Sequence, residues 1–250
     1  MKVTKWWKKL AAAIVAAGIW VPSAAYAVNI PVGDPSFETY VVPSRGYAYA
    51  TGSLGTYRPT SPWIDDQDFN LPPDYVQDDA KSNWLYNTAY ANANGRGTPR
   101  TGDQAMHGFA HYSSQELASV FEAGKTYTLS VWAQNSVNPR AFPMGVFMYL
   151  FDGNVTFSDA NALSKGLYTS INQRTAGMTP EQSQANWSQI TLTHTVQPGA
   201  PEIGHPIGVG FFLRRGTAIE DVTLSAVPEP ASVILVGLGG LSLLGLRRRR

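Results

Sequence analysis

Hydrophobic and polar residues alternate with a period of two in several stretches of the second half of the chain. In residues 126–132, Tyr127, Leu129 and Val131 share one face, and the positions between them are Thr or Ser. The same alternation occurs in 142–150, 190–196, 207–213 and 222–226. Because successive side chains of a strand point to opposite faces, this pattern predicts half-buried β-strands, and the many Thr, Val, Tyr and Phe residues favour the same structure.

Turn signals separate these predicted strands. Gly124, Gly153 and Gly199 lie in short polar segments between the alternating runs. Short, evenly spaced strands with such turns are typical of a β-sandwich or jelly roll. We therefore predict an all-β fold, a single jelly-roll β-sandwich with long loops over residues 28–226. An N-terminal signal helix and a C-terminal hydrophobic helix are expected to flank it. The chain has no Cys, and a domain of roughly 200 residues buries enough surface to fold without disulfides.

Residues 43–102 have a different character. They are rich in Pro, Gly, Asn and Tyr and show no long alternation, and the stretch from Asp65 to Asp79 carries six acidic residues and no basic one. We expect long loops with a few short strands here, and a small helix at 158–166 further along the chain. Loops of this length in a compact domain are usually functional or disordered.

The N-terminal 27 residues have the three parts of a secretory signal peptide. Four lysines within the first nine residues precede an apolar run at 10–21, and Ala25 and Ala27 form a small-x-small cleavage pattern. As a helix, the apolar run would span only about 18 Å, which is short for a membrane-spanning segment. We predict cleavage by signal peptidase after Ala27; the alternative is an uncleaved N-terminal anchor.

The C-terminal segment, residues 227–250, combines a short motif, an apolar run and a basic end. Pro228, Glu229 and Pro230 precede sixteen uncharged residues at 231–246, and the chain ends in four arginines, which are Arg247, Arg248, Arg249 and Arg250. A cluster of arginines favours the cytoplasmic side of a membrane. The apolar run would be about 24 Å long as a helix, short for a permanent span. These features indicate a sorting signal that is inserted in the membrane only until it is processed.

This tail resembles the PEP-CTERM sorting signal of Gram-negative bacteria. The resemblance implies recognition by an exosortase and export to the cell surface or the extracellular polysaccharide matrix. It covers about the last 25 residues and says nothing direct about residues 28–226. An ordinary single-pass tail anchor is the alternative.

The charges of the predicted domain argue against nucleic acid as a partner. Residues 28–226 contain 11 basic and 17 acidic residues, a net charge of −6. Proteins that bind DNA or RNA present a basic face to the phosphates. We therefore expect no nucleic-acid partner.

Three stretches of the domain resemble galactose-binding-like jelly rolls, the frame of many carbohydrate-binding modules. Residues 29–38 resemble their opening segment, residues 115–131 their central strands, and residues 219–224 their closing strand. In this family a calcium ion often ties the first and last strands together. The resemblance places Glu38 and Asp221 at a structural Ca²⁺ site; the alternative is that both are exposed acids at the sheet edge.

Aromatic and acidic residues of the loop region suggest a glycan site. Trp63 and Trp84 fall outside the alternating runs, and an indole ring offers a flat apolar face on which a sugar can stack. The nearby acids Asp65, Asp66 and Asp68 can accept hydrogen bonds from sugar hydroxyls. The alternative is that these rings attach the loops to the sandwich.

The common catalytic motifs are missing from the sequence. It contains no G-x-S-x-G, no Walker A, no G-x-G-x-x-G and no Cys nucleophile. We therefore expect a non-enzymatic surface or matrix protein, associated with exopolysaccharide or biofilm, that binds extracellular polysaccharide. Two other hypotheses remain, a secreted hydrolase acting on polysaccharide and a purely structural matrix protein.

Overall fold

The computed structural model describes the sandwich and the residues next to it. The ranges described are 26–38, 47–49, 63–65, 84–94, 96–108, 111–135, 144–214 and 216–229. Val28–Val227 form one compact unit. In the described part of the chain, no helix has the length and apolar character needed to cross a membrane. The expected signal helix and C-terminal hydrophobic helix lie outside these ranges.

The strands of the compact unit pair in two sheets, as predicted for a β-sandwich. The seven-stranded sheet has the order β10-β7-β12-β5-β4-β2, and β1 also pairs with β12. Its strands are β1 (Val28–Ile30), β2 (Tyr47–Tyr49), β4 (Trp84–Asn87), β5 (Gln104–His107), β7 (Lys125–Asn135), β10 (Ser188–Thr195) and β12 (Thr217–Pro228).

The five-stranded sheet has the order β3-β6-β11-β8-β9. Its strands are β3 (Ile64–Asp65), β6 (His111–Val120), β8 (Val146–Asp152), β9 (Ala162–Tyr168) and β11 (Pro206–Leu213). The all-β prediction is therefore confirmed.

The main core lies between the two sheets and is built from the alternating faces read from the sequence. Tyr127, Leu129 and Val131 of β7 are fully buried, as are Val209 and Phe211 of β11. The pairing of β7 with β10 sets Leu129 opposite Leu192 and Val131 opposite Ile190. Burial of these apolar side chains away from water is the main source of stability for such a sandwich.

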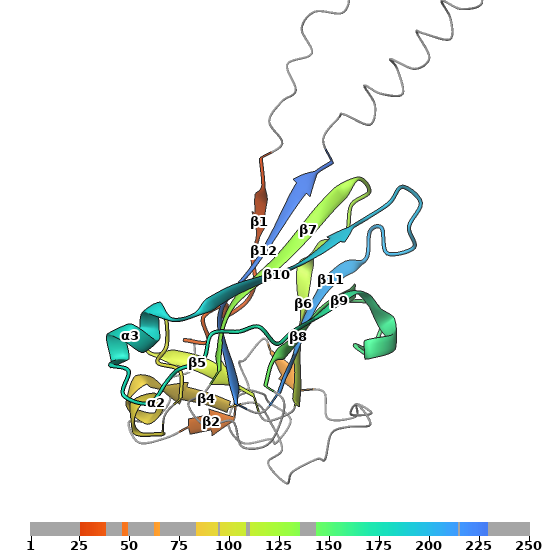
Figure 1. The fold of residues 1–250 in the computed structure, drawn as a ribbon. Helices are drawn as coiled ribbons and strands as arrows, with labels where there is room; N and C mark the ends of the chain where they lie inside the picture. The colour runs from red at the N-terminus through yellow and green to blue at the C-terminus, as the bar shows by residue number, and fades with distance from the viewer. Residues whose placement is uncertain are drawn as a thin grey trace, which may run out of the picture. The chain divides into compact units, whose positions relative to one another are not determined.

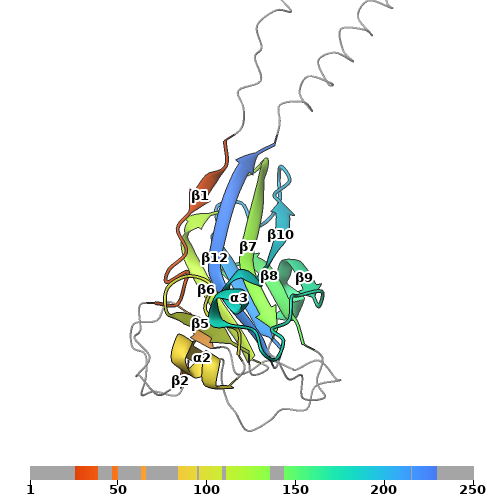
Figure 2. The same ribbon diagram turned by 60° about the vertical axis from the view of Figure 1, so that its left-hand side comes forward.

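Two short helices lie at one end of the sandwich, next to the seven-stranded sheet (Figures 1 and 2). They are α2 (Thr88–Asn94) and α3 (Pro180–Ala185). The sequence explains where α3 begins. The Thr179 side chain accepts a hydrogen bond from the Gln182 backbone, the Gln182 side chain accepts one from the Thr179 backbone, and Pro180 occupies the first helical turn.

The prediction of a small helix at 158–166 is wrong except for its first turn. Asp159–Asn161 form a single 3-10 turn, η2, which is capped by the Ser158 side chain. Residues 162–168 are strand β9, whose pairing with β8 sets Leu167 opposite Phe147. Hydrogen bonding to a neighbouring strand outweighs the weak local helical tendency of this segment. In 43–102, the described elements are the expected few short strands, β2, β3 and β4, together with α2, which was not expected.

Candidate functional site

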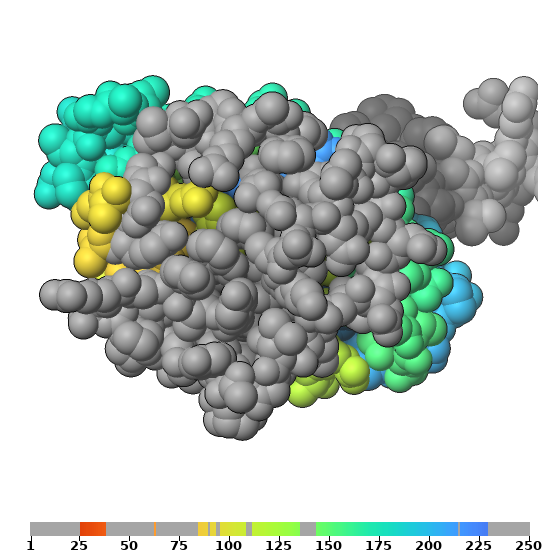
Figure 3. Space-filling view, turned by 90° about the horizontal axis from the view of Figure 1, so that it is seen from below, coloured from red at the N-terminus to blue at the C-terminus, as the bar shows by residue number. Residues whose placement is uncertain are grey.

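Two clusters of side chains outside the main core are candidates for a functional site. One is a polar network at the helical end of the seven-stranded sheet. The other is a set of aromatic rings on the outer face of the five-stranded sheet. Seen from below (Figure 3), the helical end in yellow and turquoise and the green segment around β9 lie on opposite sides. The two clusters are therefore considered separately.

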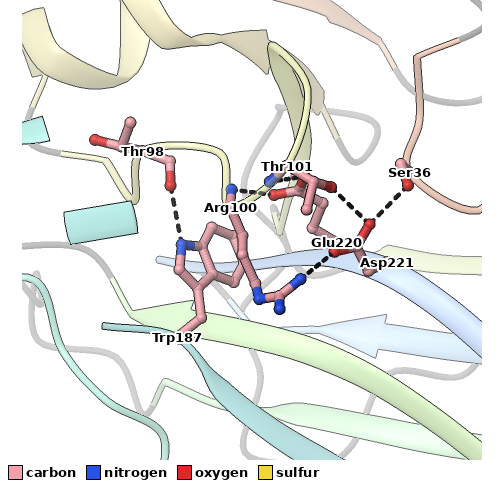
Figure 4. A network of polar contacts seen from close by, with 7 residues as sticks. All are labelled: Ser36, Thr98, Arg100, Thr101, Trp187, Glu220 and Asp221. Carbon is pink, nitrogen blue, oxygen red and sulfur yellow. Dashed lines mark hydrogen bonds and ion pairs between the residues drawn. The ribbon is translucent and has the colours of Figure 1, made fainter. Parts of the chain in front are cut away.

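The polar network joins three segments that are far apart in the sequence (Figure 4). Both oxygens of Glu220 accept hydrogen bonds from the 100–101 turn, Oε2 from the Arg100 backbone N–H and Oε1 from the Thr101 backbone N–H at 2.7 Å. The Thr101 hydroxyl bonds to Glu220 Oε1 at 2.8 Å and to Asp221 Oδ1 at 2.7 Å. Asp221 Oδ1 also accepts a 2.7 Å hydrogen bond from the Ser36 hydroxyl. The network thus connects the first segment, the turn and the last strand.

A change of side-chain alternation within β12 places both acids in this network. Ile219 and Val222 both face the main core, although a regular strand would put them on opposite faces. Asp221 lies between them with a φ of 53°, in the left-handed region. Asp tolerates this conformation better than most residues. The shift by one residue turns Glu220 and Asp221 out of the core and toward the 100–101 turn.

The electrostatics of Glu220 differ from those of an exposed acid. Glu220 is fully buried, and this burial raises the pKa of its carboxyl to about 8. Hydrogen bonds from Thr101 and Arg100 lower it and the charge of Asp221 raises it further. The Arg100 guanidinium forms an ion pair with Asp221 Oδ2 at 2.6 Å and lies over the Trp132 ring, 3.9 Å from its centroid. A cation therefore already stands beside the two acids.

The two acids predicted to hold calcium do not fit a calcium site. Glu38 Oε1 accepts hydrogen bonds from the backbone N–H groups of Asp103, at 2.9 Å, and Gln104, at 2.7 Å. Asp221 is occupied by two hydroxyl donors and by the Arg100 guanidinium. Calcium needs six to eight oxygen ligands, typically ~2.4 Å away. Within the described ranges, no three His, Cys, Asp or Glu side chains are grouped to hold a metal ion. The calcium prediction therefore finds no support here.

Neighbouring contacts hold the 96–101 segment in place. The Trp187 indole N–H donates to the Thr98 carbonyl at 2.9 Å, and the buried Tyr86 hydroxyl donates to the Gly97 carbonyl at 2.6 Å. The Arg174 guanidinium donates to the Ala91 carbonyl at 3.2 Å and to the Arg96 carbonyl. Since each of these donors has an acceptor within the protein, we interpret the network as a clamp that fixes the chain, not as a site with free groups.

The second cluster is the aromatic face, which lies outside the sandwich core. It consists of Tyr112, Phe147, Tyr149, Phe151, Phe157 and Phe212. Strand pairing arranges its members in rows across the sheet. Phe212 of β11 lies between Tyr112 of β6 and Phe147 of β8, and Phe147 in turn lies opposite Leu167 of β9. The five-stranded sheet therefore carries apolar side chains on both faces.

Two glycines of β11 make room for the rings. Gly208 and Gly210 lie on the same face as Phe212, and a Cβ on Gly210 would come within 2.7 Å of the Phe157 ring. The Phe157 and Phe151 rings stack with centroids 4.6 Å apart. The segment between β8 and β9 therefore folds over one end of the aromatic face. Exposure increases toward the other end, where Phe147 is half-buried and Leu167 is 44% exposed.

Polar groups border the aromatic face. The Tyr149 hydroxyl is hydrogen-bonded to Tyr112 and Asp159, and burial raises the pKa of Tyr149 above its usual range. Asp159 is paired with Lys165 at 2.7 Å. Arg214, at the end of β11, lies with its guanidinium carbon 5.2 Å from the centroid of the Phe147 ring. Rings beside hydrogen-bonding and charged groups form the usual chemistry of a small-molecule or sugar site.

Trp63, predicted to stack on a sugar, lies in the main core. It is 1% exposed, and its ring packs against Phe37 and Phe211, with centroids 5.7 Å away in both cases. Its indole N–H donates to the Asp34 carbonyl at 3.3 Å. This placement contradicts the stacking interpretation and agrees with the alternative, in which the ring attaches a loop to the sandwich.

The other predicted glycan residues are only partly described. Trp84 begins β4, opposite His107 of β5, and Asp65 ends β3, opposite Ser113 of β6. The two residues therefore belong to different sheets. Asp66 and Asp68 lie outside the described residues. A glycan role for Trp84, Asp65, Asp66 and Asp68 stays a prediction.

The sorting residues are described in part. β12 ends at Pro228, and Glu229 follows it, whereas Pro230 and the four terminal arginines lie outside the described residues. At the other end Ala27 is exposed and directly precedes β1, and Ala25 lies outside the described residues.

Comparison with known proteins identifies the tail and places the fold. Residues 226–250 match the PEP-CTERM protein-sorting motif. No curated protein matches this sequence. The described sandwich is similar to the apo form of a cyclase from Fischerella sp., with 20% identity and a TM-score of 0.55 over 81% of this chain and 98% of that one.

Two further structures are similar to different degrees. The Stig cyclase Fisc from Fischerella sp. TAU, in complex with an indole compound, has 18% identity and a TM-score of 0.57 over 82% of this chain and 100% of that one. A carbohydrate-binding module of family CBM4 has 13% identity and a TM-score of 0.39 over 78% of this chain and 99% of that one. At these identities the similarity to the cyclases concerns the fold alone.

The sorting motif establishes where the protein is sent. A PEP-CTERM signal directs export across the inner membrane, with the tail held in the membrane until an exosortase processes it, and the protein ends at the cell surface. The chain is therefore an exported surface protein that carries a PEP-CTERM sorting signal behind an all-β sandwich.

Proposed function

We propose that this surface protein is a non-enzymatic carbohydrate-binding protein of the cell surface or extracellular matrix, and that the aromatic face is its binding site. The observation that carries the proposal is the row of apolar side chains across four strands on the outer face of the five-stranded sheet, Tyr112, Phe212, Phe147 and Leu167. The first two are buried, and Phe147 and Leu167 are partly exposed. A core between two sheets does not require a second apolar layer outside it.

The chemistry of the aromatic face suits a sugar chain. Aromatic rings pack against the C–H faces of sugar rings, and neighbouring polar groups bind the hydroxyls. Phe147 is half-buried and lies between exposed Leu167 and the Arg214 guanidinium, and Lys165 is next along β9 on the same face. We therefore place the ligand at the Phe147 end, away from the Phe157 ring.

The non-enzymatic part of the proposal is supported by the contacts of Glu220 and Asp221, the two neighbouring acids of the clamp. Glu220 accepts two backbone hydrogen bonds, Asp221 is engaged by Arg100 and Ser36, and the Thr101 hydroxyl lies within hydrogen-bond distance of both carboxyl groups. An acid–base pair for glycoside hydrolysis needs carboxyl groups that reach the scissile bond from both sides. The proposal also needs no calcium, because Arg100 supplies a positive charge at Asp221.

Binding to the exopolysaccharide of the producing cell tests the proposal. The exported protein should be retarded when that polysaccharide is included in a native gel, and Phe147→Ala should remove most of the retardation. Trp132→Ala is the matched control, because it removes an aromatic ring from the seven-stranded sheet and should leave binding intact. Equal binding by wild type and Phe147→Ala would place the site elsewhere.

The same samples separate the proposal from its two rivals. A hydrolase would shorten the polysaccharide during incubation, which size-exclusion chromatography would detect. A purely structural matrix protein would show no retardation with any glycan. We expect retardation without shortening.

A further inference from the structure

We propose that the aromatic face recognises an acidic glycan, and that the Arg214 guanidinium binds its carboxylate. This inference rests on the proposed carbohydrate-binding function and specifies the class of ligand. It rests on the Arg214 side chain, whose buried Nε has no hydrogen-bond partner among the described residues.

Arg214 is buried but is not satisfied by the protein. It is 9% exposed, and its Nε atom is buried without a hydrogen-bond partner. Among the described residues, no carboxylate forms an ion pair with it. Its contact is the Phe147 ring, whose centroid lies 5.2 Å from the guanidinium carbon. The other buried arginine among the described residues, Arg174, differs in this respect, because it donates to backbone carbonyls.

A buried guanidinium Nε–H without an acceptor is costly to the folded chain. Charged and polar groups taken out of water normally have hydrogen-bond partners, and a missing partner leaves the desolvation cost without compensation. Two hydrogen bonds fix the backbone of Arg214 in place. Its N–H donates to the Gly145 carbonyl at 2.9 Å, and its carbonyl accepts from the Thr217 N–H at 3.1 Å. A ligand oxygen would complete this site.

The arrangement specifies an anion attached to an apolar ring face. The planar guanidinium fork matches the two oxygens of a carboxylate. Alternation along β11 places Arg214 on the same face as Phe212, next to the row that contains Phe147 and Leu167. A uronic acid residue has both features, a sugar ring that can pack on Phe147 and a carboxylate that can reach Arg214.

Charge is distributed unevenly along the aromatic face. Glu116 of β6 lies opposite Gly208 of β11. Since Gly208 precedes Arg214 by six residues, Glu116 and Arg214 are about 20 Å apart along the strand direction. The acidic group is at the end covered by Phe157, and the buried Arg214 is at the end where Phe147 and Leu167 are partly exposed. Because residues 28–226 carry a net charge of −6, an anionic polymer is not attracted over long range. Binding must depend on this local guanidinium, and we expect it to weaken little with added salt.

The test compares two forms of one polymer. Isothermal titration calorimetry of the exported protein with polygalacturonate and with its methyl-esterified form changes the carboxylate and keeps the sugar backbone. We expect wild type to bind polygalacturonate at least tenfold more tightly. Arg214→Gln should reduce this ratio to about one. Lys125→Gln, which removes a positive charge from an exposed pair with Glu122, should leave the ratio unchanged.

The outcomes separate this inference from the proposed function. Equal affinity of wild type for both polymers, or an unchanged ratio in Arg214→Gln, overturns the acidic-glycan inference and leaves glycan binding standing. Failure of wild type to bind either polymer or the host exopolysaccharide overturns both. If Arg214→Gln does not fold, Arg214→Lys decides, since it keeps the charge but lacks the fork. A ratio at least threefold below wild type supports the inference, and an unchanged ratio overturns it.

Discussion

At the scale of single residues, Glu220 makes the stability of the protein depend on pH. Burial raises its pKa from an ordinary 4.5 to about 8 in the folded chain. Between these values the folded state binds a proton that the unfolded state releases. The contribution of Glu220 to stability is therefore fully present below pH 4.5 and is lost as the pH rises through 8, with a slope of up to about 1.4 kcal/mol per pH unit.

Glu220→Gln should remove this dependence. The free energy of unfolding, measured by urea denaturation from pH 5 to pH 9, should fall less steeply for the variant than for wild type. Its absolute value should also drop, because an amide N–H₂ replaces one of the oxygens that accept from Arg100 and Thr101. Glu122→Gln, at an exposed turn, is the control that should keep the wild-type slope. Parallel curves for wild type and Glu220→Gln would contradict the assignment.

Gly210 is a second position at which one added atom, a Cβ, should change the stability of the protein. A Cβ there would approach the Phe157 ring within 2.7 Å. Gly210→Ala should therefore lower stability by ~1–3 kcal/mol, the usual cost of overpacking. In the background of Phe157→Ala the same substitution should cost much less, because the ring is gone. Additive losses in the double variant, measured by chemical denaturation, would show that Phe157 does not cover Gly210.

At the scale of elements, the two-residue strand β3 is held by its neighbour Trp63. β3 pairs with β6 through only Ile64 and Asp65, too few residues to be stable alone. Trp63 is 1% exposed between Phe37 and Phe211. Trp63→Ala should cost ~3–5 kcal/mol of stability, and Trp63→Phe should cost less. A Trp63→Ala protein with normal stability and lost glycan binding would instead restore the stacking role predicted from the sequence.

The strands show which features the alternation of hydrophobic and polar residues can predict. It identified the inward faces of β7, β10, β11 and β12 correctly, because one side of each strand must pack in the core. It did not identify the aromatic face, although the residues 146–151 are all apolar. A continuous apolar run is the pattern of a strand buried on both faces. Interpreted in that way, β8 would have indicated the second layer.

The clamp could not be predicted in the same manner. Its members Ser36, Thr101 and Asp221 are separated by up to 185 residues in the chain, and alternation carries no information about such contacts. The left-handed Asp221 has no local signal, since a glycine would mark such a position more clearly than an Asp. The resemblance to jelly rolls did bring Glu38 and Asp221 to neighbouring positions, since they bond to residues 103–104 and 100–101. The calcium ion that the resemblance implies has no support among the described residues.

At the scale of the whole molecule, export determines which form of the chain functions. We predict that the surface protein begins at Val28 and has lost its tail near Pro228, Glu229 and Pro230. The compact unit Val28–Val227 retains all the residues of the clamp and of the aromatic face, so processing at these points leaves both intact. Intact-mass spectrometry of protein extracted from the cell surface measures both ends at once.

A variant in the sorting motif makes this prediction specific. Glu229 lies one residue beyond the end of β12, so Glu229→Ala should change recognition by the exosortase without changing the sandwich. We expect the variant to accumulate in the membrane fraction with Arg247–Arg250 still attached, and with the wild-type melting temperature. Wild-type surface protein that retains the four arginines would contradict tail processing, while leaving attachment to the membrane in place. A Glu229→Ala protein that is processed normally would show that the exosortase reads the apolar run and the basic end without this carboxylate.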